Sequence, residues 1–158
     1  MKIWNKQPDS EDRGQLVDVS NKYTFAQSSF KQVGKNDWSY YGGFSYSNNI
    51  DDFNIATDEI RNQNILFHGK MVAMKSFSDK FSIKTGLESY MTRYSEQLIS
   101  QDLKREISDN QYNLFTEADY YLSNKLVFRG GLRSGHSSLA NQTWLDPRFS
   151  LAYKFENE

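Results

Sequence analysis

Charged side chains that recur at every second or fourth position are the residues of this sequence with the clearest chemical potential. They fall in three short segments: Lys84, Glu88, Glu117, Asp119, Arg129 and Arg133. Residues two or four apart share one face of a β-strand, so each pair would point to the same side of a sheet. Carboxylates and cations gathered on one face form ion pairs and hold water. We therefore predict that these six side chains line a hydrated surface.

The sequence offers little for catalysis or metal binding. His68 and His136 have no paired-histidine spacing, and the chain contains no cysteine that could act as a nucleophile or a zinc ligand. No nucleophile elbow, phosphate-binding loop or zinc motif is found. We expect a protein that is not an enzyme, with no catalytic residue, no cofactor and no bound metal.

The segments that carry the charged residues alternate strictly between polar and apolar positions. The apolar positions are Trp38, Tyr40, Phe44, Phe81, Ile83, Leu87, Leu126, Phe128, Leu132, Phe149, Leu151 and Tyr153. A repeat of two residues is typical of strands with one apolar face. We therefore expect an all-β chain in which these twelve side chains share the face opposite to the charges.

Three glycines recur in register within these segments. Gly43, Gly86 and Gly131 are 43 and 45 residues apart, and a short polar turn precedes each copy. Each period has room for two long strands, one tight turn and one longer connection. Glycine within a strand indicates a bend, a bulge or the close approach of another backbone.

The pattern predicts an antiparallel up-and-down meander of about seven long strands. The expected strands are 22–33, 38–48, 64–77, 80–95, 111–122, 125–135 and 148–155. Tight turns are expected at 34–37, 78–80 and 123–125, and long loops at 49–63, 96–110 and 136–147, with a possible short helix in 97–108. Residues 1–20 form a poorly defined N-terminal segment and residues 21–158 the hairpin repeats. Short turns at one end and long loops at the other are typical of outer-membrane barrels.

Composition supports a sheet that is apolar on one side only. Hydrophobic residues make up 37% of the chain and its mean hydropathy is −0.77, yet 15% of residues are aromatic. Disordered chains are poor in aromatic residues. The net charge of −1 gives no basic surface for nucleic acid. No segment reaches the roughly 18 apolar residues that a transmembrane helix requires.

Aromatic residues lie near both ends of the expected strands. Trp38, Phe77, Phe81, Tyr120 and Tyr121 lie beside the tight turns, and Tyr46, Tyr90, Tyr94 and Tyr112 toward the long loops. Two girdles of aromatic rings flank the apolar band of membrane barrels. The sequence therefore predicts strands that cross a membrane as part of a transmembrane β-barrel. The six charged side chains are expected to face its lumen, and the twelve apolar side chains to face lipid.

The C-terminal half resembles the barrel of TonB-dependent receptors. The segment 114–133 resembles a family hairpin with Phe115, Glu117, Tyr120 and Arg133 at matching positions, and the segment 145–155 resembles the strand that follows it. Less closely, the resemblance extends back to Trp38. It implies a receptor that imports a scarce ligand, be it a siderophore, vitamin, glycan or peptide, across the bacterial outer membrane.

The resemblance also implies partners. Family members use a barrel of about 22 strands with a plugged lumen, embedded in outer-membrane lipid and driven by a TonB protein. No plug domain or TonB box is recognisable here, and seven strands are too few to close such a barrel. The first 15 residues also lack the apolar run of a signal peptide. On this interpretation we expect the chain to be part of a longer protein.

Two alternatives remain open. One is a water-soluble all-β barrel that binds a small ligand, and the other is an outer-membrane porin-like barrel without TonB coupling. In a membrane wall Phe44, Leu87, Phe128 and Leu132 would be exposed. In a soluble module they would be buried, with the arginines outside.

Overall fold

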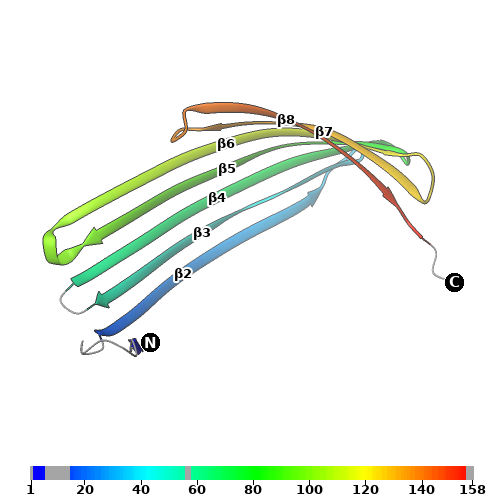
Figure 1. Ribbon diagram of the computed structural model, residues 1–158. Helices are drawn as coiled ribbons and strands as arrows, with labels where there is room; N and C mark the ends of the chain where they lie inside the picture. The colour runs from blue at the N-terminus through cyan, green and yellow to red at the C-terminus, as the bar shows by residue number, and fades with distance from the viewer. Residues whose placement is uncertain (1, 6–14, 56–57, 156–158) are drawn as a thin grey trace. The chain divides into compact units, whose positions relative to one another are not determined.

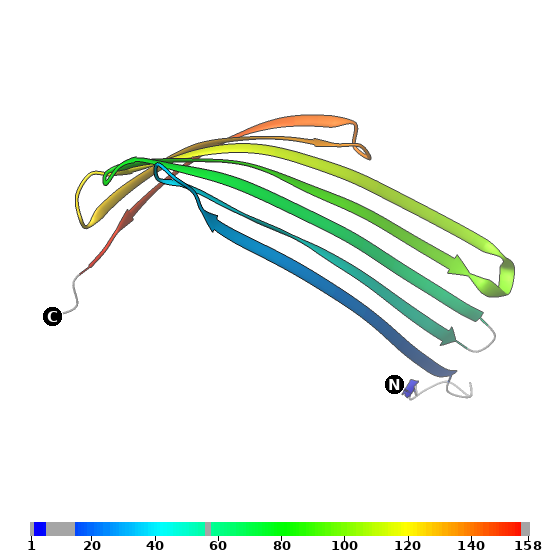
Figure 2. The same ribbon diagram turned by 180° about the vertical axis from the view of Figure 1, so that it is seen from behind.

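The fold is an antiparallel meander of long strands in a single sheet. In the computed structural model, residues 2–5, 15–55 and 58–155 are described. Adjacent strands follow one another in chain order, as Figures 1 and 2 show from two sides. The elements are β1 (Lys2–Asn5), β2 (Gln15–Val33), β3 (Trp38–Ile55), β4 (Asp58–Ser78), β5 (Phe81–Leu98), the 3₁₀ turn η1 (Ile99–Gln101), β6 (Leu103–Tyr121), β7 (Leu126–Ser137) and β8 (Gln142–Tyr153). The predicted all-β meander of seven long strands, β2 to β8, is confirmed.

The sheet begins at β1 and ends at β8. The four-residue β1 pairs with the start of β2, so the N-terminal segment is partly strand rather than undefined throughout. The strand order is linear, and no pairing joins the first strand to the last within the described residues. The structure therefore describes an open sheet and not a closed barrel. None of the described residues forms a helix that is both long and apolar enough to cross a membrane.

The three tight turns fall where the sequence predicts them. β2 and β3 are joined by 34–37, β4 and β5 by 79–80, and β6 and β7 by 122–125. In the first turn Asn36 and Asp37 have φ values of 56° and 60°. Asn and Asp adopt this left-handed conformation at lower cost than most residues. The Gly34 N–H donates to the Trp38 carbonyl at 2.8 Å and closes this hairpin.

The long loops predicted from the sequence are wrong. Residues 49–55 and 58–63 continue β3 and β4, 103–110 belong to β6, and 136–147 mostly form the ends of β7 and β8. The helix expected in 97–108 is reduced to the three residues of η1. His136, expected to open a loop, lies inside β7. Connections at both ends of the described strands are therefore short, and the predicted asymmetry between turns and loops is not observed.

The chain divides into two compact units. The first unit comprises Met1–Ala26, Tyr46–Leu66 and Thr92–Ser108, and the second comprises Gln27–Ser45, Phe67–Met91 and Asp109–Glu158. All six charged and all twelve apolar residues singled out from the sequence belong to the second unit.

Strand register in the second unit fixes which side chains share a face. Asp119 lies opposite Arg129 in the β6–β7 pair, and Phe128 lies opposite Leu151 in the β7–β8 pair. Directly opposite residues point to the same side of an antiparallel sheet. We call the side that carries the six charged residues the charged face, and the other side the apolar face.

Burial in the second unit is concentrated on the charged face. The buried residues of the described chain are Val72, Glu88, Asn113, Phe115, Asp119 and Ser137, together with Gly86 and Gly135. Each has the strand parity or the contacts that place it on this face. Among the described elements no second layer packs on the sheet, so these side chains are shielded by their own neighbours. The described strands therefore form one layer, without a hydrophobic core between two layers.

One edge of the sheet, formed by β8, contains a proline. Lys154 donates its N–H to the Lys125 carbonyl at 2.8 Å, which makes this a hydrogen-bonded pair. Hydrogen-bonded and non-hydrogen-bonded pairs alternate along an antiparallel ladder. The Leu132–Pro147 pair is therefore non-hydrogen-bonded, and the Pro147 nitrogen faces the edge that has no partner strand among the described residues.

Candidate functional site on the charged face

Glu88 is the centre of the first ion cluster on the charged face. Its carboxylate lies 2.7 Å from the Arg133 guanidinium, 3.1 Å from His68 Nε2 and 3.6 Å from Lys70 Nζ. These partners come from β4 and β7, on either side of β5 and β6. Only 6% of Glu88 is exposed. A carboxylate this buried requires paired charges to remain ionised. Arg133 and Lys70 supply positive charge here, and His68 supplies a hydrogen-bond partner.

Aromatic and amide groups complete this cluster. The Tyr90 ring stacks on His68 with centroids 4.4 Å apart. Asn113 Oδ1 accepts a hydrogen bond from Arg133 Nε at 3.4 Å. The imidazole and the guanidinium are therefore held in place by contacts additional to Glu88.

Asp119 is the centre of the second cluster. It accepts a hydrogen bond from Arg129 Nη2 at 3.1 Å and lies 3.4 Å from Lys84 Nζ. Lys84 also reaches Glu117, at 3.6 Å. Asp119 is 5% exposed. All six charged residues predicted to share a face are thus brought together in two clusters that link β4, β5, β6 and β7.

Phe115 is a residue of this face whose burial the sequence analysis did not predict. Its ring is buried, lies 5.3 Å from Lys70 Nζ, and occupies the space above Gly86, where a Cβ would be 2.5 Å from Phe115 Cζ. The strand parity that it shares with Glu117 and Asp119 was the available signal. The in-register glycine is explained here by space for a ring.

The two other in-register glycines also lie at close contacts. A Cβ at Gly43 would be 2.5 Å from the Ser28 carbonyl oxygen, and a Cβ at Gly131 would be 2.9 Å from Glu117 Cγ. None of the glycines described has a positive φ. Close approach of a neighbour, rather than an unusual backbone conformation, therefore accounts for them.

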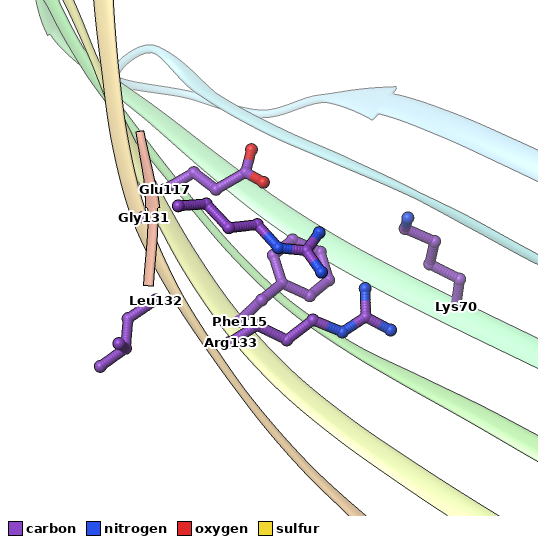
Figure 3. Close-up of a pocket in the computed structure, with 7 residues that line it drawn as sticks. Lys70, Phe115, Glu117, Gly131, Leu132 and Arg133 are labelled. Atoms are coloured by element: carbon purple, nitrogen blue, oxygen red, sulfur yellow. The ribbon is translucent and has the colours of Figure 1, made fainter. Parts of the chain in front are cut away.

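A small cavity of about 140 Å³ lies between the two clusters. Its lining includes Lys70, Phe115, Glu117, Arg133 and Arg148. In Figure 3 the side chains of Phe115, Glu117 and Arg133 extend to one side of the sheet, whereas Leu132 extends to the other. A cavity of this size with charged walls suits a few water molecules. Its chemistry is that of a hydrated ionic surface.

Large apolar side chains on the opposite face are exposed. Exposed fractions are 55% for Phe44 and Leu87, 41% for Phe128, 47% for Leu132 and 75% for Phe149. Trp38, Tyr40, Leu151 and Tyr153 are also exposed, and Phe81, Ile83 and Leu126 are half-buried. On the charged face Arg133 is half-buried, while the Arg129 side chain is 47% exposed.

Only some of the aromatic rings near the strand ends have the strand parity of the apolar face. Trp38, Phe77, Phe81, Tyr112 and Tyr120 have the strand parity of the apolar face. Tyr90, in contrast, stacks on His68. Tyr94 shares the strand parity of Tyr90, and Tyr121 that of Asp119, so these three have the parity of the charged face. Proximity to a strand end does not determine the face of a ring, so these three rings do not join a girdle on the apolar face.

Polar contacts replace aromatic ones in the first unit. Beyond Tyr46 the alternate positions of β3 are Asn48, Ile50, Asp52 and Asn54. Asn48 contacts Gln63 at 3.0 Å, and Asp52 contacts Arg61 at 2.6 Å. Likewise, Arg93 of β5 lies 3.3 Å from Glu106 of β6. The apolar stripe of these strands therefore gives way to mostly polar residues in the first unit.

Asp109 fixes the connection between β7 and β8. Its Oδ1 accepts hydrogen bonds from the Leu139 N–H at 3.0 Å and from Ser137 Oγ at 2.9 Å. These bonds favour the ionised carboxylate and lower the pKa of Asp109 below its usual value. The residue acts as a brace for the 138–141 turn.

The described residues include no group of three or more His, Cys, Asp or Glu side chains placed to hold a metal ion. His136 donates to or accepts from Thr143 Oγ1 at 3.0 Å. No protein-family model matches the chain, and searches for similar curated proteins and for similar solved structures also found no match.

Proposed function

We propose that this chain forms part of the wall of a bacterial outer-membrane β-barrel of the TonB-dependent receptor type, which takes up a scarce ligand. The observation that carries the proposal is the division between the two faces of the second unit. Ionised side chains are buried and paired on one face, while large apolar side chains on the other face remain uncovered. A membrane wall requires this inverted distribution.

The apolar face has the polarity profile of a lipid-facing surface. Along β3 it carries Trp38 and Tyr40 at the turn, Phe44 in the middle and Tyr46 beyond, and along β6 it runs from Tyr120 through Leu114 to Tyr112. Rings with polar atoms favour the two interfaces of a bilayer. Counted with their end residues, Trp38–Tyr46 and Tyr112–Tyr120 are each nine residues long, at the lower end of the roughly 9 to 11 residues of a tilted membrane strand.

The charged face supports a watery interior. Its two clusters pair carboxylates with basic side chains, and the cavity between them is lined by Lys70, Arg133 and Arg148. Such a surface would contact solvent or a plug domain inside a complete barrel. The remaining strands of that barrel would join the open edges of this sheet.

The choice of a TonB-dependent receptor over a porin-like barrel rests on the resemblance of 114–133 and 145–155 to the family hairpin and strand. It implies a plug domain, a TonB protein and a small-molecule, glycan or peptide ligand as partners. Uptake that disappears when TonB is deleted from the host would support this choice. Uptake that persists without TonB would favour a porin.

Spin labels along β8 test the membrane assignment directly. The chain has no cysteine, so single cysteines at positions 148 to 153 can each carry one nitroxide after reconstitution into phospholipid vesicles. Oxygen, which concentrates in lipid, should relax the labels at Phe149, Leu151 and Tyr153. A water-soluble nickel chelate should relax those at Arg148, Ser150 and Ala152.

The outcome that contradicts the proposal is equally clear. A chain that stays in the aqueous phase, or labels reached equally by the chelate on both sets of positions, would show that the apolar face does not contact lipid. The water-soluble ligand-binding module would then be the better assignment.

A further inference from the structure

We infer that a hollow on the apolar face of the second unit binds one acyl chain of a membrane phospholipid. The hollow has a volume of about 330 Å³ and is walled by Phe30, Phe44, Met71 and Leu87. This inference rests on the proposed function, because it places the hollow in lipid, and it adds a specific ligand to that function.

Strand parity places the hollow on the apolar face. Phe44 and Leu87 belong to that face, and the Phe67 ring stacks on Phe44 with centroids 6.4 Å apart. A Cβ at Gly42, which shares the parity of Phe44, would lie 3.1 Å from the Phe30 ring. Lys70 also borders the hollow, but its ammonium group lies near Glu88 on the charged face. No charged group therefore enters the hollow from the residues described.

The floor of the hollow is a glycine with empty space above it. A Cβ built on Gly69 would meet only Phe67 Cε1, at 3.9 Å. The surrounding walls are 49% exposed at Phe30, 55% at Phe44 and Leu87, and 57% at Met71. One missing side chain among large apolar neighbours leaves a hollow of about 330 Å³ on this face.

The occupant follows from the chemistry of the hollow and of its surroundings. Ser28 and Ser89 are the polar residues of its lining with the parity of the apolar face, so it provides no charge for a headgroup or a soluble ligand. The same face carries Trp38 and Tyr40 at one end of its apolar stripe and Tyr46 and Tyr112 at the other, as a bilayer requires. Filling a hollow in an apolar surface with methylene groups is favourable in proportion to the area covered.

Two matched glycine substitutions test the assignment. Gly69→Leu fills the hollow. Gly130→Leu makes the same change on the same face outside it, where a Cβ meets Phe128 Cε1 and Phe149 Cδ1 at 3.4 and 3.6 Å. Each protein is inserted into vesicles of phosphatidylethanolamine and phosphatidylglycerol, extracted into detergent, and examined for retained phospholipid by native mass spectrometry.

We expect the unmodified chain and Gly130→Leu to retain one phospholipid, and Gly69→Leu to lose it by about tenfold or more. Equal retention by all three proteins, or equal loss in both variants, would overturn the inference. Loss of a cross-linked dimer in Gly69→Leu, with lipid unchanged, would instead identify a second copy as the occupant. Vesicle flotation before extraction separates the two proposals, because a chain that does not float with lipid contradicts both.

Discussion

At the scale of single residues, Gly86 shows how a small side chain allows a large one to be buried. A Cβ at this position would lie 2.5 Å from Phe115 Cζ and 2.7 Å from the Met71 carbonyl oxygen. The Phe115 ring in turn lies beneath Lys70. Glycine at 86 is thus part of the packing of the charged face.

Gly86→Ala should lower the free energy of unfolding by about 1–3 kcal/mol, the usual cost of overpacking. The measurement is urea unfolding of the chain in detergent. Gly69→Ala is the matched control, since the space above Gly69 is open. Adding Phe115→Leu to Gly86→Ala should recover part of the loss, because the clashing ring atoms are removed. An unchanged unfolding midpoint in Gly86→Ala would contradict this account.

The hydrogen bonds that Asp109 accepts depend on pH, and the Leu139 amide reports on them. Because the pKa of Asp109 is lowered in the folded chain, its hydrogen bonds are fully present above the unfolded value of about 3.9. They are lost as the pH falls through the lower folded value. The NMR shift of the Leu139 amide should therefore titrate with a midpoint below about 3.9, and Asp109→Asn should abolish that titration. A midpoint above this value would show that the Asp109 carboxylate does not hold the 138–141 turn through these hydrogen bonds.

At the scale of elements, the ion clusters tie non-adjacent strands together. Arg133 of β7 reaches across β6 to Glu88 of β5, and Asn113 of β6 accepts a bond from the same guanidinium. A slip of one residue in any of these strands would turn its charges toward the apolar face. The clusters therefore specify the register of the sheet.

Arg133→Met should destabilise the chain by about 1–3 kcal/mol, since a hydrogen bond to a buried charge is lost. Glu88→Gln should cost more, because three basic partners lose their carboxylate together. In the double variant the Arg133→Met effect should largely vanish, which a double-mutant cycle in urea would show. Arg148→Met is the control: its pair with Asp146 is exposed and lies within one strand, so we expect about 0–1 kcal/mol. Additive effects of Glu88→Gln and Arg133→Met would contradict the energetic coupling of these two residues.

The sequence predicted the positions of the strands better than their lengths. Around Phe81 and Phe128 the alternation of apolar and polar residues sets both strand and face, because one side is uniformly apolar. In 58–63 and 103–110 neither side is uniformly apolar, and polar residues occur on both, as the Arg61–Asp52 and Arg93–Glu106 contacts illustrate. Backbone hydrogen bonding continues there without a hydrophobic pattern, so a strand resembles a loop in the sequence alone.

The same limit applies to the candidate site. Parity placed Lys84, Glu88, Asp119, Arg129 and Arg133 on one face. It could not reveal which carboxylate pairs with which cation, since that depends on register across three or four strands. The burial of Phe115 required a neighbouring glycine on another strand, a relation that no local pattern contains.

At the scale of the whole molecule, the proposed membrane wall predicts that arginine substitutions at adjacent residues have different effects on membrane insertion. Phe149 and Ser150 are neighbours in β8 and point to opposite faces. Phe149→Arg should lower membrane insertion, because an arginine facing lipid costs about 2–4 kcal/mol near the midplane. Ser150→Arg should insert as well as the unmodified chain. Vesicle flotation measures both variants.

If the sheet is water-soluble instead, Phe149→Arg should be the more soluble of the two variants. Phe149 is 75% exposed, so an arginine there would then improve solubility in buffer without any loss of folding. Equal insertion of the two variants would also count against a lipid-facing position for Phe149.

Pro147 has a consequence for what can join the sheet at β8. Its nitrogen carries no hydrogen and faces outward, so the row of amide donors along that edge is interrupted between Leu145 and Phe149. A strand that docks there must satisfy its own carbonyl at this level by water, by a bulge or by ending short of it. Because this row of donors is interrupted, identical chains cannot pair along its whole length, which disfavours fibre growth. The interruption therefore favours an incoming neighbour shaped for this edge over indiscriminate self-association.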